Sequence, residues 1–293
     1  MRLLIYGAGV IGSLYGVLLS ESGNDVTVYA RGKRLQALLE RGLQYKSKKS
    51  VKKAAVNIIS RLEPEDYYDF IFLAVRETQL YTALNELNEN KSPTIVTMVN
   101  SLDRYEKWEN ICGKGRIFPA FPGAGGGFEN GILDAKLTPR MIQRTTLAEI
   151  DGRKSERLKR LVGLFKKAGI PYQIVSDMHA WQICHLGMVV PIADAYYESD
   201  NPEQVGKDKR IMQKTARQIK LNFIKISEKG IALSPRKMWL FKIFPIPLLT
   251  FGLRIAFQSE FGDKFMYRHS MKASDEMRQL HKQFYGYLNT TSV

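Results

Sequence analysis

Six residues near the start of the chain have the types and spacing of a phosphate-binding loop. The segment Gly7-Ala8-Gly9-Val10-Ile11-Gly12 follows a short apolar stretch and precedes a segment with helical spacing. In such a unit Gly7 allows the tight turn, Gly9 lets the backbone approach a pyrophosphate, and Gly12 lets the helix pack close to the strand. The helix N-terminus then offers free N–H groups and a positive dipole end to phosphate oxygens. We therefore expect a dinucleotide to bind at Gly7, Gly9, Val10, Ile11 and Gly12.

The residues after the next expected strand indicate which dinucleotide binds. Folds that bind NAD usually carry an acid here, which accepts a hydrogen bond from the ribose 2′-OH. This chain reads Tyr29-Ala30-Arg31-Gly32-Lys33-Arg34 instead. The planar guanidinium of Arg31 suits a phosphate, because two of its N–H groups can donate to phosphate oxygens at once. The sequence therefore favours NADP(H) over NAD(H) as the cofactor.

Alternating strands and helices must position these residues. Apolar runs predict strands over 2–6, 25–30, 68–75, 94–99, 115–120, 141–146 and 170–175, and helical spacing predicts helices over 10–22 and 79–87 and one ending near 41. Strands separated by helices predict an α/β fold with a parallel sheet and crossovers on both faces. Asn100, directly after one strand, is expected at the nicotinamide side of such a fold. The glycines at 125–127 are expected to let the backbone approach a ligand or to form a flexible loop.

The pattern becomes helical after about residue 176, with helices expected over 179–197, 208–229 and 270–288. We therefore expect a Rossmann-type NADP(H)-binding domain over 1–176 and an all-helical substrate and dimerisation domain over 177–293. The apolar segment 238–257 is long enough to suggest a membrane span, but Lys242, Arg254 and two prolines interrupt it. It is expected to form helix, turn and helix around an apolar pocket or subunit interface, with a peripheral membrane contact as the alternative.

Composition narrows the function classes. The chain has 293 residues, 44% of them hydrophobic, and a formal net charge of +15. Residues 31–53 hold nine basic side chains against Glu40 alone, with Tyr45 as the single aromatic residue among them, so we expect a solvated face and no nucleic-acid partner. The two cysteines, Cys112 and Cys184, have no CxxC spacing. We therefore expect a reducing, cytoplasmic location, no metal site and no integral membrane segment.

The chain resembles ketopantoate reductase (2-dehydropantoate 2-reductase) and its paralogues over nearly its whole length. The glycine motif and Arg31 match the family, and residues 69–79 resemble its D-x-v-l-v-a-v-K-a-x-q motif with Arg76 for the lysine. Residues 95–101 resemble v-v-x-l-q-N-G with Asn100 in place, and residues 147–152 resemble i-G-e-l-d-G. The resemblance implies NADPH-dependent carbonyl reduction, with Arg76 near the cofactor and Asn100 in the active site.

The segment that begins at Trp181 departs from the family's catalytic pattern W-x-K-l-x-x-N-x-x-x-N-P. In the family the lysine donates the proton and the asparagines bind substrate. In this chain, counting from Trp181 without gaps, Ile183 stands at the lysine position, and Gly187 and Pro191 stand at the two asparagines. The departure predicts a substrate other than ketopantoate.

Another group must then supply the proton, and histidine titrates in the right range. His185 lies about 200° around the expected helix from Ile183, whereas His179 lies one turn before Ile183 on the same face. His269 and Glu276 are seven residues apart and would share a face of one helix. In two alternative alignments, His269 or Glu276 corresponds to the family's C-terminal motif. The candidate catalytic residues are Asn100, His185, His179, His269 and Glu276.

Three functions stay open at this stage. The first is an NADP(H)-dependent oxidoreductase acting on a small carbonyl or alcohol substrate other than ketopantoate. The second is a non-enzymatic NADP(H)-binding sensor or scaffold, and the third is a 2-dehydropantoate 2-reductase with a relocated acid. A homodimer is the expected assembly if the apolar 238–257 segment forms a subunit interface.

Overall fold

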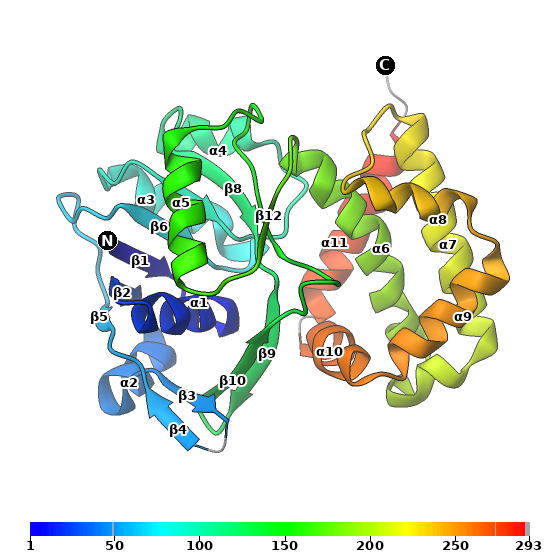
Figure 1. The fold of residues 1–293 in the computed structure, drawn as a ribbon, viewed down its shortest axis with the longest axis horizontal. Helices are drawn as coiled ribbons and strands as arrows, with labels where there is room; N and C mark the ends of the chain where they lie inside the picture. The colour runs from blue at the N-terminus through cyan, green and yellow to red at the C-terminus, as the bar shows by residue number, and fades with distance from the viewer. Residues whose placement is uncertain (49, 273, 291–293) are drawn as a thin grey trace. The chain divides into compact units, whose positions relative to one another are not determined.

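The computed structural model describes residues 1–48, 50–272 and 274–290, apart from the side chains of His269 and Lys272. The chain divides into two compact units, Met1–Met178 and His179–Val293 (Figure 1). This division lies close to residue 176, where the pattern of the sequence changes from alternating strands and helices to helices alone.

The first unit is built on a sheet of eight described strands. At its centre four neighbouring strands run parallel: β7 (Ile95–Thr97), β6 (Phe70–Leu73), β1 (Arg2–Tyr6) and β2 (Asp25–Tyr29). Tyr6 pairs with Tyr29 and Leu73, and Leu73 pairs with Thr97, so the four carboxyl ends lie level. The full order is β12–β11–β8–β7–β6–β1–β2–β5, with β5 (Asn57–Ile59), β8 (Ile117–Phe121), β11 (Thr145–Leu147) and β12 (Tyr172–Ile174).

One end of this sheet differs from the expected parallel arrangement. Strand β11 pairs antiparallel with β8, and it covers residues 145–147 rather than 141–146. A parallel neighbour requires a crossover that returns the chain to the starting end of the sheet. The chain between β8 and β11 forms a pair of antiparallel strands instead of a crossover helix, so β11 enters from the opposite end.

A second sheet in the first unit was not expected. Its order is β4–β3–β10–β9, with β3 (Gln44–Ser47), β4 (Ser50–Lys53), β9 (Ala124–Glu129) and β10 (Ile132–Leu137). The glycines at 125–127 therefore lie in a strand, and the expectation of a flexible loop is wrong. A Cβ at Gly126, whose φ is +145°, would lie 2.3 Å from the Asp134 carbonyl oxygen. Glycine is needed there because β9 and β10 approach too closely for a side chain.

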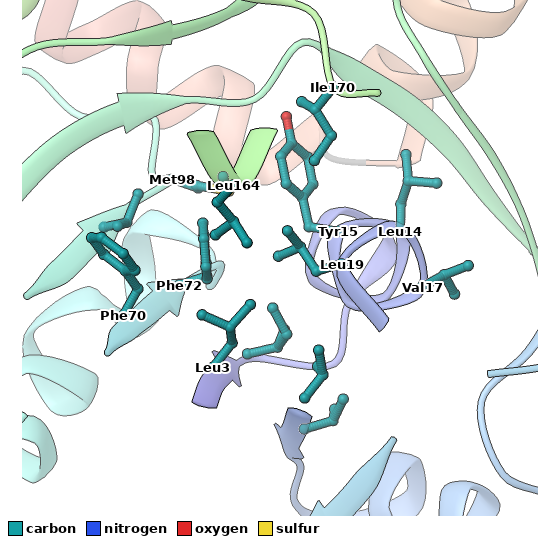
Figure 2. Close-up of a cluster of buried hydrophobic side chains, with 14 of the residues drawn as sticks. Leu3, Leu14, Tyr15, Val17, Leu19, Phe70, Phe72, Met98, Leu164 and Ile170 are labelled. Carbon is teal, nitrogen blue, oxygen red and sulfur yellow. The ribbon is translucent and has the colours of Figure 1, made fainter. Parts of the chain in front are cut away.

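The helices of the first unit bury apolar faces against the main sheet. Tyr15 and Leu19 of α1, together with Leu164 of α5, enclose Leu3 and Phe72 of the central strands (Figure 2). The helices α4 and α5 were not expected. The bounds are α1 (Val10–Glu21), α2 (Gly32–Arg41), η1 (Glu77–Gln79), α3 (Leu80–Glu89), α4 (Tyr105–Cys112) and α5 (Glu156–Lys167).

Every regular element described in the second unit is helical (Figure 1). The bounds are α6 (Met178–Glu198), η2 (Pro202–Lys207), α7 (Lys209–Glu228), η3 (Arg236–Trp239), α8 (Leu240–Ile243), α9 (Ile246–Phe257), a π-helical turn η4 (Gly262–Tyr267), α10 (Arg268–Lys272) and α11 (Ser274–Asn289). In the helix expected over 270–288, the structure describes helix on both sides of residue 273. The apolar 238–257 segment forms helix, turn and helix as expected.

Both the buried and the exposed faces of this segment are apolar. Leu249 and Phe257 are buried, whereas Ile243, Leu248 and Phe251 expose more than half of their surface. Among the described residues no helix combines the length and the apolar character that crossing a bilayer requires.

Candidate functional site

The glycine loop between β1 and α1 has the backbone geometry that the sequence predicts. Gly7 has a φ of +109°, and a Cβ there would lie 2.5 Å from the Ala74 carbonyl oxygen. A Cβ at Gly12 would lie only 2.0 Å from the Gly7 carbonyl oxygen, so the first turn of α1 packs directly on the loop. By contrast, nothing lies within 4 Å of the position of a Cβ at Gly9. The loop is closed on its protein side and open at Gly9.

The open position coincides with the start of α1. Gly9 is the N-cap residue with a φ of −72°, and no side chain caps this helix end. The first turn holds no acidic residue. Backbone N–H groups in the first turn of a helix have no intrahelical acceptor, and the helix dipole is positive at this end. The backbone N–H groups of Val10, Ile11 and Gly12 can therefore donate hydrogen bonds to an anion at this helix end, where the dipole also stabilises negative charge.

The level ends of the four central strands bring the other predicted cofactor residues to this end of the sheet. Arg31 follows β2, Arg76 follows β6, and Asn100 follows β7. The loop is tied to its neighbours through the backbone. The Gly7 N–H donates to the Tyr29 carbonyl at 3.4 Å, and the Ala74 N–H donates to the Tyr6 carbonyl at 2.9 Å. Ligands of parallel α/β sheets bind at these carboxyl ends.

Asn100 has an unused polar atom. Its Oδ1 is buried and accepts no hydrogen bond from any part of the protein that the structure describes. A buried amide oxygen without a partner loses the hydrogen bonds that it made to water, at a cost of about 1–3 kcal/mol. Such an atom at the end of a central strand suits an acceptor for a donor group on a ligand.

Arg31 makes an ion pair that the sequence did not predict. Its Nη1 lies 2.7 Å from Oε1 of Glu86 on α3, and its guanidinium lies over the Tyr29 ring, 5.7 Å from the ring centre. The Tyr29 hydroxyl donates to Oε2 of Glu86 at 3.0 Å, and the Tyr6 hydroxyl donates to the same oxygen. Burial, and next the hydrogen bond to Glu86, raise the pKa of Tyr29. Both hydroxyls therefore stay protonated as donors at neutral pH.

A second arginine beside the loop was also missed. Arg34 donates from Nε to the Ala8 carbonyl at 3.1 Å and from Nη2 to the Ser13 hydroxyl at 3.3 Å. Its guanidinium lies 4.2 Å from the centre of the Phe128 ring on β9. Burial, and next the charge of Arg41, lower the pKa of Arg34. The unexpected second sheet therefore holds a cation against the glycine loop.

Arg76, by contrast, is exposed. It is the residue before η1, and its carbonyl accepts the Gln79 N–H at 2.9 Å. Within the described residues its guanidinium forms no ion pair, unlike that of Arg31. It is therefore available to an anionic ligand at the end of β6.

The other four candidate catalytic residues belong to the second unit. His185 is 9% exposed and stacks on Trp181 with ring centres 5.1 Å apart. The rings of His179 and Tyr287 lie nearly perpendicular, with their centres 6.4 Å apart. Glu276 lies in the first turn of α11, whereas the predicted partner His269 is on α10 and its side chain lies outside the described residues. The prediction that His269 and Glu276 share a face of one helix stays a prediction, because residue 273 between them lies outside the described residues.

The face of α6 on which the resemblance places the proton donor packs inside the second unit. Ile183 is 1% exposed. A Cβ at Gly187 would lie 3.0 Å from the Ile226 side chain of α7, and Asn222 of α7 donates to the Gly187 carbonyl at 3.0 Å. Close packing of α6 on α7 thus explains glycine at this position.

A histidine–carboxylate pair between α6 and α11 has no signal in the sequence. His281 Nδ1 lies 2.9 Å and 3.0 Å from the two oxygens of Asp194. Burial raises the pKa of Asp194, and the His281 partner opposes this shift. The two residues are far apart in the chain, so only the packing of α11 on α6 reveals the pair.

Part of the chain resembles a known protein family. Residues 3–147 match the family model described as ApbA: Ketopantoate reductase PanE/ApbA. A 2-dehydropantoate 2-reductase of Archaeoglobus fulgidus is 28% identical over 181 residues, which are 60% of this chain and 57% of the relative. That of Pyrococcus horikoshii is 32% identical over 118 residues, 39% of this chain and 38% of the relative. The matched segments thus span less than two thirds of these relatives.

Solved structures resemble the chain over almost its full length. A 2-dehydropantoate 2-reductase from Geobacter metallireducens GS-15 matches with a TM-score of 0.69 and 17% identity, over 98% of this chain and 100% of that one. A D-mandelate dehydrogenase in complex with NADH matches with a TM-score of 0.68 and 16% identity, over 100% of both chains. At such identities the likeness establishes the fold: an N-terminal Rossmann-like domain with a largely parallel sheet, followed by a helical part.

Proposed function

We propose that this chain is an NADP(H)-dependent oxidoreductase that acts on a small carbonyl or alcohol substrate other than ketopantoate. Its sequence and fold support membership of the ketopantoate reductase PanE/ApbA family. The observation that carries the proposal is the glycine loop, which is closed at Gly7 and Gly12 and open at Gly9 before an uncapped helix end. That combination fits a pyrophosphate. The nearby buried Asn100 oxygen, which lacks a partner among the described residues, is a second observation that fits a ligand at the same end of the sheet.

Different groups of the chain would bind different parts of the cofactor. The first-turn N–H groups of α1 would hold the pyrophosphate, and Arg31 and Arg76 would hold the 2′-phosphate end. When bound, the nicotinamide supplies a hydride to the substrate carbonyl. Asn100 would accept a hydrogen bond from the cofactor or substrate amide or hydroxyl, which fixes the reacting groups.

A proton donor to the substrate oxygen must come from elsewhere. Ile183 carries no proton to give, and it is buried. His179, His185, His269 and Glu276 remain the candidates, and the burial of His185 against Trp181 makes it the weakest of the described side chains. The loss of the lysine also favours a second candidate function, a protein that binds NADP(H) without turnover.

Two measurements on one sample test the proposal. NADPH and NADH are titrated into the full chain, and NADPH absorbance is then followed with ketopantoate and with a panel of other 2-oxo acids, ketones and imines. Binding with turnover of a panel member supports the proposed reductase. Turnover of ketopantoate would identify a 2-dehydropantoate 2-reductase with a relocated acid. Binding without any turnover would favour the sensor, and no binding of either nucleotide would refute all three.

Arg31→Ala is expected to weaken NADPH binding by about 10- to 100-fold, because a charge-assisted contact to the 2′-phosphate is lost. NADH lacks that phosphate, so its affinity should change by about twofold at most. The measurement is a pair of calorimetric titrations at fixed ionic strength. Arg41→Ala, which removes the same charge from the exposed end of α2, is the matched control. Equal losses for both nucleotides would contradict the assignment of Arg31 to the phosphate.

Asn100→Ala is expected to lower turnover by about 10- to 100-fold, because a preorganised amide at the reacting end is lost. NADPH affinity should fall far less, since the phosphate contacts stay in place. Steady-state rates with the best panel substrate, together with NADPH titration, separate the two effects. Unchanged turnover in a folded variant would remove Asn100 from the active site.

A further inference from the structure

The Arg31–Glu86 pair brings a carboxylate to the place where the 2′-phosphate is expected. Glu86 stands on α3, 55 residues from Arg31 in the sequence. Its Oε1 accepts from Arg31, and its Oε2 accepts from Tyr29 and Tyr6. Both oxygens are therefore engaged, and the carboxylate is held in one orientation.

The two tyrosines fix this carboxylate beside the glycine loop. Tyr6 is the last residue of β1 and directly precedes Gly7, and Tyr29 is the last residue of β2. Their rings stack with centres 4.5 Å apart. The Gly7 N–H donates to the Tyr29 carbonyl, so the cluster of Tyr6, Tyr29, Arg31 and Glu86 borders the loop itself.

Arg31 therefore has two competing anionic partners. A 2′-phosphate reaches the Arg31 guanidinium only by displacing Glu86 or by sharing the guanidinium with it. Either arrangement costs binding energy, because a phosphate and a carboxylate within a few ångströms repel each other. The side chains of Arg31 and Glu86 are 48% and 36% exposed, so water screens the pair and exchange of partners is easy. NADH carries no phosphate there and meets no such competition.

We propose that Glu86 determines how strongly the chain prefers NADPH over NADH, by competing with the 2′-phosphate for Arg31. The inference rests on the proposed function, in that it requires a nicotinamide dinucleotide at the glycine loop. Sequence position alone does not reveal this role. The acid stands on α3 rather than at the end of β2, where dinucleotide folds usually place their selecting carboxylate.

Glu86→Gln tests the inference, because it keeps the length and an acceptor oxygen but removes the charge. NADPH affinity is expected to rise about fivefold or more, as loss of a neighbouring like charge predicts. NADH affinity should stay within about twofold. The probes are NADPH and NADH, with 2′,5′-ADP and 5′-AMP as their adenosine halves, titrated by calorimetry. Glu156→Gln removes the same charge from an exposed ion pair with Lys159 and serves as the control.

A double-mutant cycle with Arg31→Ala links the effect to its partner. If Glu86 acts by holding Arg31, Glu86→Gln should lose its effect on NADPH in the Arg31→Ala background. Glu86→Asp provides a second variant, because its shorter side chain should release Arg31 while the charge remains. It should raise NADPH affinity less than Glu86→Gln does.

The outcomes separate the inference from the proposed function. If the wild type binds both nucleotides and Glu86→Gln leaves their affinity ratio unchanged, Glu86 has no role in selection. A fall in NADPH affinity would likewise overturn the inference, since Glu86 would then be aligning Arg31 for the phosphate. If the wild type binds neither nucleotide, the proposed function itself fails.

Discussion

Gly12→Ala is expected to abolish NADPH binding and to lower the free energy of unfolding by about 1–3 kcal/mol or more, as overpacking does. The new Cβ would stand 2.0 Å from the Gly7 carbonyl oxygen and 3.0 Å from the Ile5 side chain. The first of these neighbours is backbone and cannot turn away. The start of α1 must therefore move off the loop, which displaces the N–H groups that would face the pyrophosphate. Chemical unfolding and NADPH titration measure the two effects.

Gly9→Ala is the matched control for this prediction. Its Cβ would project into open space, and its φ of −72° suits any residue. Stability should therefore change by less than about 0.5 kcal/mol, as at unconstrained sites. NADPH binding should nevertheless fall by about tenfold or more, because the methyl group occupies the space left for the ligand. If Gly9→Ala binds NADPH like the wild type, the loop does not hold the pyrophosphate.

Glu149→Ala is expected to destabilise the first unit by about 3–5 kcal/mol, because it removes the buried partner of Arg157, whose side chain is only 20% exposed. Glu149 is 2% exposed, and its Oε1 accepts from Arg157 Nε at 2.8 Å and from the Ser155 hydroxyl. Arg157 also donates to the Ile117 carbonyl at 3.1 Å, so the pair ties the start of α5 to β8. Denaturant unfolding of the full chain, followed by circular dichroism, measures the loss.

An exposed pair on the same helix provides the comparison. Glu156 pairs with Lys159 at 2.6 Å, with side chains 82% and 65% exposed. Glu156→Ala should cost no more than about 1 kcal/mol, as screened surface pairs do. Similar losses for Glu149→Ala and Glu156→Ala would mean that the Glu149–Arg157 pair contributes through something other than its burial.

The strands of the main sheet up to Ala120, apart from β5, could be predicted because their signals are local. Apolar runs gave β1, β2, β6, β7 and β8 within a few residues of their observed bounds. The second sheet could not be predicted, because β3 and β4 are rich in lysine and β9 is rich in glycine. These residues disfavour strands by composition, and only pairing with distant partners makes them strands.

The second unit shows the limit of helix prediction from periodicity. Spacing predicted α6, α7 and the helical character of 274–288, but not the π-helical turn η4 that precedes them. His281 was overlooked because a lone histidine on a helix carries no signal until Asp194 lies beside it.

The sequence by itself determined the glycine loop, its place between strand and helix, and the arginine that follows the second strand. These are local properties. The backbone freedom of glycine and the spacing of apolar residues are both readable within a few consecutive residues. Only the tertiary structure decided which groups surround that arginine. Glu86 reaches Arg31 from a helix 55 residues away, and β9 places Phe128 under Arg34. Such contacts form when the sheet brings distant strand ends level, and no short stretch of sequence contains them.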